Sequence, residues 1–201
     1  MQTNNQDILM MLAYPAFLAG YRTVDEALND HLFSNYLHTF IEQDVMPTGG
    51  AQEAMESDDL RNQWISQFAT LTIHPLANLC FDGASKLPAL ILPTLRDLLA
   101  QKRDIQRMAF LLAAYGHYLS AGTDDKGVSY ELNDTHLHHH DWAKVNSDDV
   151  VALLEISSMA AARLNTYSHF VAMYKSYRTQ IARYGVVFLL KQMAYNRLAV
   201  H

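Results

Sequence analysis

Apolar residues recur every three to four positions along most of this chain, the spacing that gathers them on one face of an α-helix. The pattern predicts helices over residues 8–18, 23–29, 32–43, 59–69, 73–81, 90–101 and 105–120. Ser147, Asp148 and Asp149 are typical of an N-cap and first turn, so they predict a helix that runs to about residue 164. Two more helices are expected over residues 166–183 and 185–198.

Turn-forming residues separate these segments. Pro15 is expected to kink the first helix or to mark a break in it, and the Pro and Gly residues at 47–50 predict a loop. Residues 122–133 carry Asp and Gly turn formers with few apolar neighbours, which predicts a loop that can include a short hairpin. No shift in composition marks a domain boundary. The sequence therefore predicts an all-α fold, a single multi-helix domain over residues 1–201.

Composition narrows the functional classes. The chain has 201 residues, half of them hydrophobic, which is enough for a sizeable core. Its formal net charge of −6 and its lack of a basic block argue against nucleic-acid binding, which needs clustered cations. The longest nearly uncharged run, residues 8–21, is too short to cross a bilayer. No secretory signal pattern is present, and the single cysteine, Cys80, is expected in the core, so we expect a cytoplasmic location.

Two sequence blocks carry a resemblance to a known family. One reads LCFDGASKLP at 79–88 and LPTLRD at 92–97; the other reads AY at 13–14 and LAGY at 18–21, followed by Asp30, Leu32-Phe33 and Met46-Pro47-Thr48. In this order and spacing they resemble the C-terminal helical domain of the long-chain mannitol dehydrogenases, which include the mannonate and tagaturonate (hexuronate) oxidoreductases. The resemblance is clearest over residues 13–133. It implies an intact enzyme that interconverts a sugar alcohol or aldonate with the corresponding ketone, using NAD or NADP.

The family's other functional parts do not match this sequence. Its dinucleotide-binding domain needs a glycine-rich turn, and the eight glycines here form no G-x-G-x-x-G. Its catalytic Lys, Asn and His precede the AY motif, and counting back places them on Met1, Gln6 and Leu9. We therefore expect no N-terminal Rossmann domain, no cofactor-binding residue, no catalytic residue and no hydride transfer by these residues alone.

The substrate side of the family's site is better matched. The resemblance implies that Lys86, which ends the D-G-x-x-K motif, contributes to a sugar-binding pocket, because an ammonium offers three hydrogen-bond donors. Asp82 would lie one helical turn earlier, where its carboxylate could orient the lysine. Many members carry an arginine where this chain has Asn78, so tight carboxylate binding is not expected. The alternative interpretation of Lys86 and Asp82 is an ordinary surface ion pair.

Several histidines and tyrosines were weighed as further sites. On one helix, His136 and His140 would share a face, and Asp134 or Asp141 could add a metal ligand. We prefer a solvated loop for the cluster, whose members are His136, His138, His139 and His140, and expect no metal site. The tyrosines at 167, 174, 177 and 184 favour core or subunit packing over a stacking platform. His117 and His169 are expected to be buried and hydrogen-bonded.

Two functions remain open at this stage. The first is the substrate-binding domain of an NAD(P)-dependent polyol or hexuronate dehydrogenase. The alternative is a non-enzymatic helical module for binding or oligomerisation. Without a cofactor domain the apolar side of the helix over residues 8–18 should be uncovered, and large apolar patches attract partners. We therefore expect a homodimer or a complementary Rossmann-domain chain to contact residues 1–20.

Overall fold

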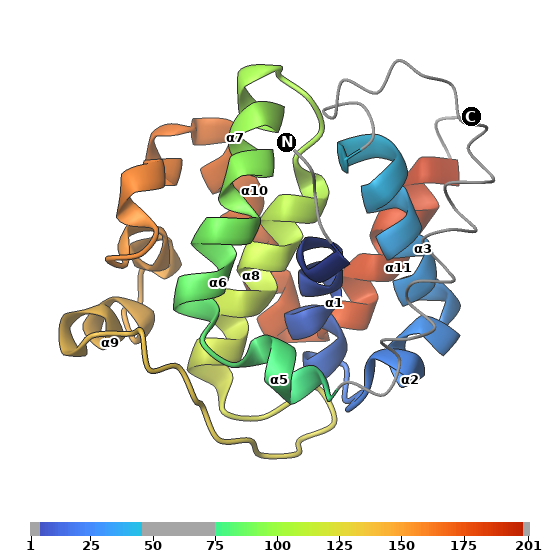
Figure 1. Ribbon diagram of the computed structural model, residues 1–201, viewed down its shortest axis with the longest axis horizontal. Coiled ribbons are helices and arrows are strands. Elements are labelled where there is room, and N and C mark those ends of the chain that lie inside the picture. Colours follow the sequence, from blue (N-terminus) through green and yellow to red (C-terminus); the bar gives the residue numbers. More distant parts are fainter. Residues whose placement is uncertain (1–4, 46–74, 199–201) are drawn as a thin grey trace.

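The computed structural model describes residues 5–45 and 75–198, and within these ranges every regular element is helical (Figure 1). The only extended pairings in the described ranges are isolated bridges, Thr23 with Pro75 and Thr123 with Ser129. The all-α prediction is confirmed. The elements are α1 (Asn5–Leu18), α2 (Val24–Asn29), α3 (His31–Phe40), the π-turn η1 (Ile41–Val45), α5 (Leu76–Cys80), α6 (Gly83–Leu90), α7 (Leu92–Ala100), α8 (Gln106–Ala121), α9 (His139–Val145), the 3₁₀ turns η3 (Val150–Glu155), η4 (Ala160–Ala162) and η5 (Leu164–Thr166), α10 (Ser168–Tyr184) and α11 (Val186–Leu198).

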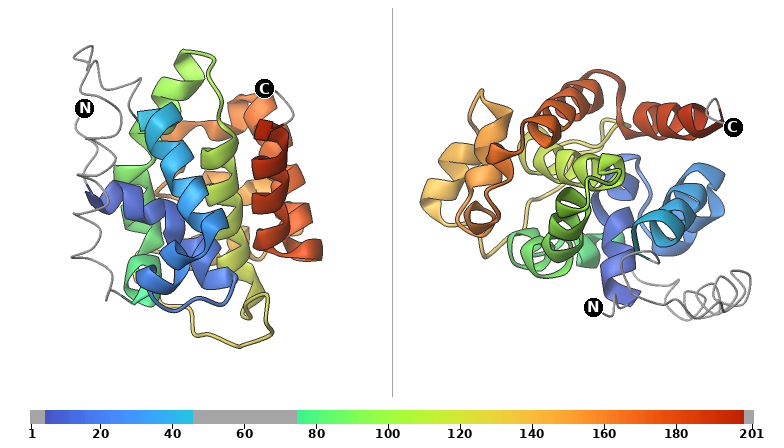
Figure 2. Two further views of the ribbon diagram at one scale, coloured as in Figure 1. Left: turned by 90° about the vertical axis from the view of Figure 1, so that its right-hand side faces the viewer. Right: turned by 90° about the horizontal axis from the view of Figure 1, so that it is seen from above.

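The core is built around α1 and α8, which lack a solvent-facing side over most of their length. Side chains 8–18 of α1 and 107–116 of α8 are all buried. Helix α1 packs on α3, α5 and α8, while α10 covers the other side of α8 and continues into α11, which returns to α3. Figure 2 shows α10 and α11 along one edge of the molecule, with α8 in front of them. Burial of such apolar helices from all sides is the main source of stability in a domain of this kind.

The burial of residues 8–18 of α1 corrects one prediction. The apolar side of residues 8–18 was expected to be uncovered and to recruit a partner, but α3, α5 and α8 of the same chain cover it. Residues 8–19 expose no more than 6% of any hydrophobic side chain. A partner contact through these side chains is therefore excluded, while residues 1–4 lie outside the described ranges.

The segment after Ser147 also differs from its prediction. The expected helix to about residue 164 is wrong: the chain forms three short 3₁₀ turns, although Asp149 does cap the first of them. The Asp141 carboxylate accepts hydrogen bonds from the backbone N–H and the hydroxyl of Ser157, which interrupts the segment. Arg163 then adopts a left-handed conformation at φ 51°. These contacts from other parts of the fold outweigh a local preference for helix.

Smaller differences concern helix boundaries. The predicted helix over 90–101 begins at Leu92, and a separate helix, α6, precedes it. The predicted helix over 32–43 ends at Phe40 and continues as the π-turn. Helix α5 begins at Leu76, after Pro75. The predicted start at residue 73 lies outside the described ranges. The predicted loop at 47–50 and the helix over 59–69 lie outside them as well. Within the described ranges, no helix combines the length and the hydropathy that a membrane span requires.

Candidate functional site

The D-G-x-x-K motif forms a sharp connection between α5 and α6, here called the elbow (residues 81–86). Asp82 occupies the left-handed region at φ 53°, and its backbone N–H donates to the Asn133 carbonyl over 3.3 Å. The Asp82 Oδ1 atom accepts hydrogen bonds from the N–H and the hydroxyl of Thr135, at 2.8 and 2.9 Å. Short polar side chains that bond locally tolerate this backbone conformation, which explains why an aspartate can stand there.

Asp134 ties the same loop to the start of α6. Its Oδ2 accepts a hydrogen bond from the N–H of Ala84 at 2.8 Å and a longer one from the Tyr115 hydroxyl at 3.3 Å. Its Oδ1 accepts from the N–H of His136 at 3.1 Å. A carboxylate at a helix N-terminus satisfies N–H groups that have no partner inside the helix. Asp82, Asp134 and Thr135 together form a polar clamp, and this clamp fixes where α6 begins.

Gly83 lets the two sequence motifs meet in space. A Cβ at this position would overlap the Tyr14 hydroxyl and would lie 2.7 Å from a ring carbon of Tyr115. Tyr14 belongs to the AY motif of α1, its hydroxyl donates to the Cys80 carbonyl over 3.2 Å, and its ring lies 4.8 Å from that of Tyr115 between centroids. The glycine is therefore required by the close approach of α1 and α8 to the elbow.

Lys86 lies on the first turns of α6, where it is partly exposed. Its ammonium donates to the Asn78 backbone carbonyl over 2.9 Å and lies 6.0 Å from the centroid of the Phe81 ring. The expectation that the Asp82 carboxylate orients this lysine is wrong, since that carboxylate bonds Thr135 and lies 3.3 Å from His136 Nδ1. The structure thus brings Lys86 and Asn78 together, and it places the Asp82 side chain in the clamp instead.

The electrostatics of the elbow favour binding over proton transfer. Burial acts to raise the pKa of the Asp82 carboxyl, but the Thr135 hydrogen bonds and the nearby His136 outweigh it and hold this pKa below its ordinary value. Burial raises the pKa values of the Tyr14 and Tyr115 phenols well above their ordinary range and also raises the pKa of the Cys80 thiol. These three groups are therefore neutral near pH 7 and act as hydrogen-bonding or packing groups.

The histidine cluster does not converge on one site. His136 precedes α9, so it does not share a helix face with His140, whose Nε2 lies 2.6 Å from the Ser157 hydroxyl. Asp82, Asp134 and His136 do bring three possible metal-ligand atoms within 4.8 Å of one another. Both carboxylates already accept hydrogen bonds from N–H or O–H donors in the clamp, so their positions are accounted for without a metal ion.

The remaining candidates divide between core and surface. Tyr174 is fully buried, whereas Tyr167 and Tyr184 are 42% and 51% exposed, so the four tyrosines do not form one continuous stripe. His117 is half-buried, but His169 is exposed, which contradicts its predicted burial. The sequence did not identify Asp134 and Thr135 as hydrogen-bond partners of the elbow. Their only sequence signal is a pair of turn-forming polar residues in a long loop, which does not identify partners about fifty positions away.

The comparisons with known proteins agree with the geometry. The model of the family described as the mannitol dehydrogenase C-terminal domain matches residues 10–182. A mannitol 2-dehydrogenase of Aspergillus fumigatus is 27% identical over 178 residues, which are 88% of this chain and 35% of that protein. A polyol:NADP oxidoreductase of Gluconobacter oxydans is 33% identical over 124 residues, which are 61% of this chain and 25% of that protein.

A solved structure extends this similarity to the fold. Pseudomonas fluorescens mannitol 2-dehydrogenase, in a ternary complex with NAD and D-mannitol, superposes with a TM-score of 0.84 and 28% sequence identity. The superposition covers 96% of this chain and 39% of that one. The chain thus spans a little over a third of the length of relatives such as the Aspergillus fumigatus protein.

Proposed function

The chain belongs to the mannitol dehydrogenase C-terminal domain family, and we propose that it acts as the substrate-binding domain of an NAD(P)-dependent sugar-alcohol dehydrogenase. The observation that carries the proposal is the position of Lys86 on the clamped elbow. The Asn78 carbonyl takes one ammonium donor at 2.9 Å, which leaves two donors for the hydroxyls of a sugar. Because the clamp and the close contact at Gly83 fix α6, the ammonium is held in place before a sugar arrives, and less ordering entropy opposes binding.

The neighbouring asparagine favours neutral sugars. Many family members carry an arginine at the position of Asn78, and a guanidinium binds a carboxylate through two parallel hydrogen bonds. An exposed amide offers hydrogen bonds but no charge. We therefore assign sugar alcohols and the matching ketoses, rather than hexuronates or aldonates, as the preferred ligands.

The nucleotide and the proton acceptor are assigned to residues other than those of the elbow. The sequence has no G-x-G-x-x-G, and the described ranges contain no strand from which such a turn could start, so these residues do not fit NAD or NADP. At Leu9, where counting back from the AY motif places the family's histidine, the side chain is 3% exposed within the core. We propose that the 201 residues bind the sugar but do not transfer hydride by themselves, and that a complementary Rossmann domain supplies the nucleotide.

The non-enzymatic helical module remains the alternative. The expectation of an uncovered apolar helix was common to both functions, and it is wrong, because residues 8–18 of α1 are buried within this chain. Any contact with a complementary domain therefore uses surfaces other than the apolar side chains of residues 8–18.

Sugar binding can be tested on the chain itself. Titration with D-mannitol, D-sorbitol and D-gluconate is followed through backbone amide NMR signals of residues 78–90. We expect saturable shifts with the two sugar alcohols and weaker ones with the acid. Lys86→Met should weaken D-mannitol binding by about tenfold, the effect of losing about 1.4 kcal/mol of charge-assisted hydrogen bonding. Lys191→Met, which alters an exposed lysine on α11, is the matched control and should leave binding unchanged.

Two results would contradict parts of the proposal. Equal D-mannitol binding by the Lys86→Met protein and the unaltered chain would remove the assigned role of the lysine. Oxidation of NADH with D-fructose by the 201-residue chain would show that hydride transfer does not need residues from elsewhere. Neither result depends on the other, so each part of the proposal can fail separately.

A further inference from the structure

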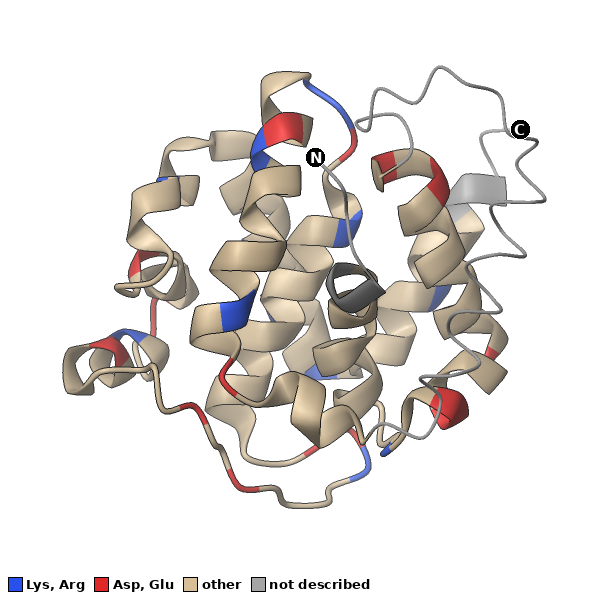
Figure 3. Ribbon diagram, viewed as in Figure 1, with Lys and Arg blue, Asp and Glu red and all other residues tan. Residues whose placement is uncertain are grey.

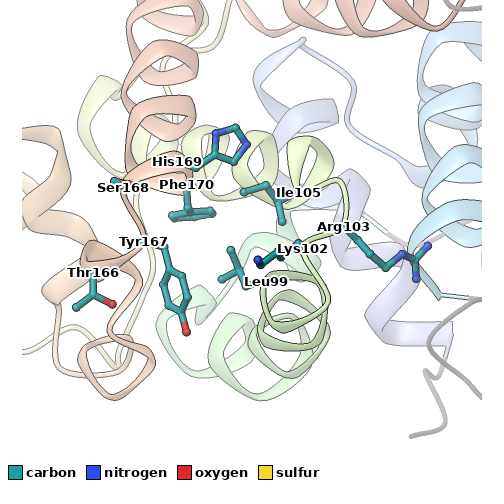
Figure 4. A pocket seen from close by; sticks show the side chains of 9 residues that line it. All are labelled: Leu99, Lys102, Arg103, Ile105, Thr166, Tyr167, Ser168, His169 and Phe170. Atoms are coloured by element: carbon teal, nitrogen blue, oxygen red, sulfur yellow. The ribbon is translucent and has the colours of Figure 1, made fainter.

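A cavity lies far from the elbow, between the α7–α8 connection and the first turn of α10. Its volume is about 400 Å³, and Figure 4 shows the side chains that line it. In Figure 1 the elbow lies at the lower end of α6, whereas the α7–α8 connection lies at the upper end of the molecule. We propose that this cavity binds a small organic anion that carries an apolar group.

The cavity has an apolar floor. Ile105 and Phe170 are 2% and 0% exposed and contribute core side chains to it, and Leu99 of α7 packs against the same core. The Tyr167 ring, 42% exposed, stands at one side of the cavity (Figure 4). Apolar and aromatic walls of this kind bind a ring or a short hydrocarbon group, which gives a ligand part of its binding free energy.

The charge at its rim is positive. Lys102 and Arg103 line the cavity, and none of the described residues that line it is acidic. The Arg103 guanidinium donates to the Gln43 carbonyl and points away from the cavity in Figure 4. Figure 3 shows basic positions, drawn in blue, in the connection between α7 and α8. Next along the chain, the Asp104 carboxylate lies 3.1 Å from the Arg107 guanidinium and accepts a hydrogen bond from the N–H of Gln106 at 2.9 Å.

Lys102 therefore remains as the available cation. It is exposed, and it forms no ion pair within the described ranges. Its own backbone conformation is unusual as well, with φ 54° in the turn that ends α7. Glycine adopts this conformation without cost, whereas a side chain there costs roughly 1–2 kcal/mol. A lysine occupies a position that suits glycine, beside a cavity whose described lining residues include no acid, and this favours a role for its charge.

The facing wall adds hydrogen-bond donors. Ser168 and His169 begin α10, whose first turn contains no acidic residue and whose Tyr167 N-cap makes no side-chain capping bond. Backbone N–H groups in a first turn have no partner inside their own helix. One ammonium, a hydroxyl and these N–H groups suit a phosphate or carboxylate, while the floor suits its apolar substituent.

The proposal can be tested with a ligand and its two halves. Phenyl phosphate, inorganic phosphate and phenol are each titrated into the chain at low ionic strength, and NMR signals of residues 99–105 and 166–170 are followed. We expect phenyl phosphate to give saturable shifts there and to bind at least fivefold more tightly than either half. Lys102→Gly should weaken phenyl phosphate binding at least fivefold, and it should fold normally because glycine fits the left-handed backbone.

Two further variants complete the design. Lys102→Arg keeps the charge and should retain phenyl phosphate binding, and Lys191→Met removes a remote lysine and should have no effect. Unchanged binding by the Lys102→Gly protein would overturn the proposal. Phosphate binding as tight as that of phenyl phosphate would overturn it too, because the apolar floor would then contribute nothing. Shifts spread over other surfaces would mean that the cavity is not the binding site.

Discussion

The close packing of Gly83 against Tyr14 and Tyr115 supports both the fold and the proposed sugar-binding site. In the Gly83→Ala protein, the new methyl group overlaps the Tyr14 hydroxyl and lies 2.7 Å from Tyr115. Both rings are fully buried, so neither can move away into solvent. The methyl group must therefore displace α6 from α1 and α8, and the Lys86 ammonium moves with it.

The expected cost follows from the contacts involved. Extra volume in a packed core costs about 1–3 kcal/mol. Loss of the Tyr14–Cys80 hydrogen bond adds about 1 kcal/mol, and the better helix propensity of alanine returns up to about 1 kcal/mol. We expect the free energy of unfolding to fall by about 1–3 kcal/mol. Urea denaturation followed by far-UV circular dichroism measures it. Gly127→Ala is the control, because a Cβ added there meets nothing within 4 Å apart from its chain neighbours.

The Gly127→Ala control measures the cost of backbone strain in the absence of steric overlap by the new methyl group. Gly127 has φ 79°, so Gly127→Ala should cost about 1 kcal/mol through backbone strain alone. Tyr14→Phe removes the hydroxyl oxygen that the new methyl group of Gly83→Ala would overlap. The double variant should then be more stable than the sum of the two single changes predicts, by about 1 kcal/mol. Additive losses, or a Gly83→Ala protein as stable as the original, would refute this account of the elbow.

Two further predictions concern buried titrating groups. Burial, with a smaller effect of Arg178, lowers the pKa of His117 from 6.5 to about 4. The unfolded chain therefore takes up a proton here before the folded one does, and stability present above about pH 6.5 is lost as the pH falls towards 4. Because the ring is partly exposed, we expect the loss in the free energy of unfolding to be on the order of 1–2 kcal/mol. In the His117→Gln protein the urea midpoint should therefore fall less steeply with acid than in the original chain. An identical acid dependence of the two proteins would contradict the prediction. Cys80 is 1% exposed and burial raises the pKa of its thiol, so it should react with a disulfide reagent only on unfolding, and rapid labelling of the native chain would argue otherwise.

Local sequence signals located the elements whose causes are themselves local. Thr23 and Glu26 form a capping box at the start of α2, within the predicted helix over residues 23–29, and both reciprocal hydrogen bonds are present. Gly20 follows the end of α1 at φ 89°, a backbone conformation that glycine adopts readily. The core position of Cys80 is confirmed as well. Each of these depends on residues within a few positions along the chain, which is the range that sequence patterns describe.

Contacts between distant segments decided the rest. Nothing near Ser147 shows that Asp141 will hold Ser157 and stop a helix, and nothing near Asp134 shows that Ala84 will be its partner. Likewise the apolar residues of α1 predict a buried face without showing which chain buries it.

By itself the sequence determined the all-helical class, several helix ends and the family resemblance, because spacing, capping residues and short motifs act over one or two turns. Only the tertiary structure decided that α1 is enclosed and that the Asn78 carbonyl, rather than the Asp82 carboxylate, receives Lys86. It also decided that Lys102 borders a cavity with α10. The reason is physical: a hydrogen bond or a packed contact depends on distance in space, and only the folded chain sets that distance for residues far apart in sequence.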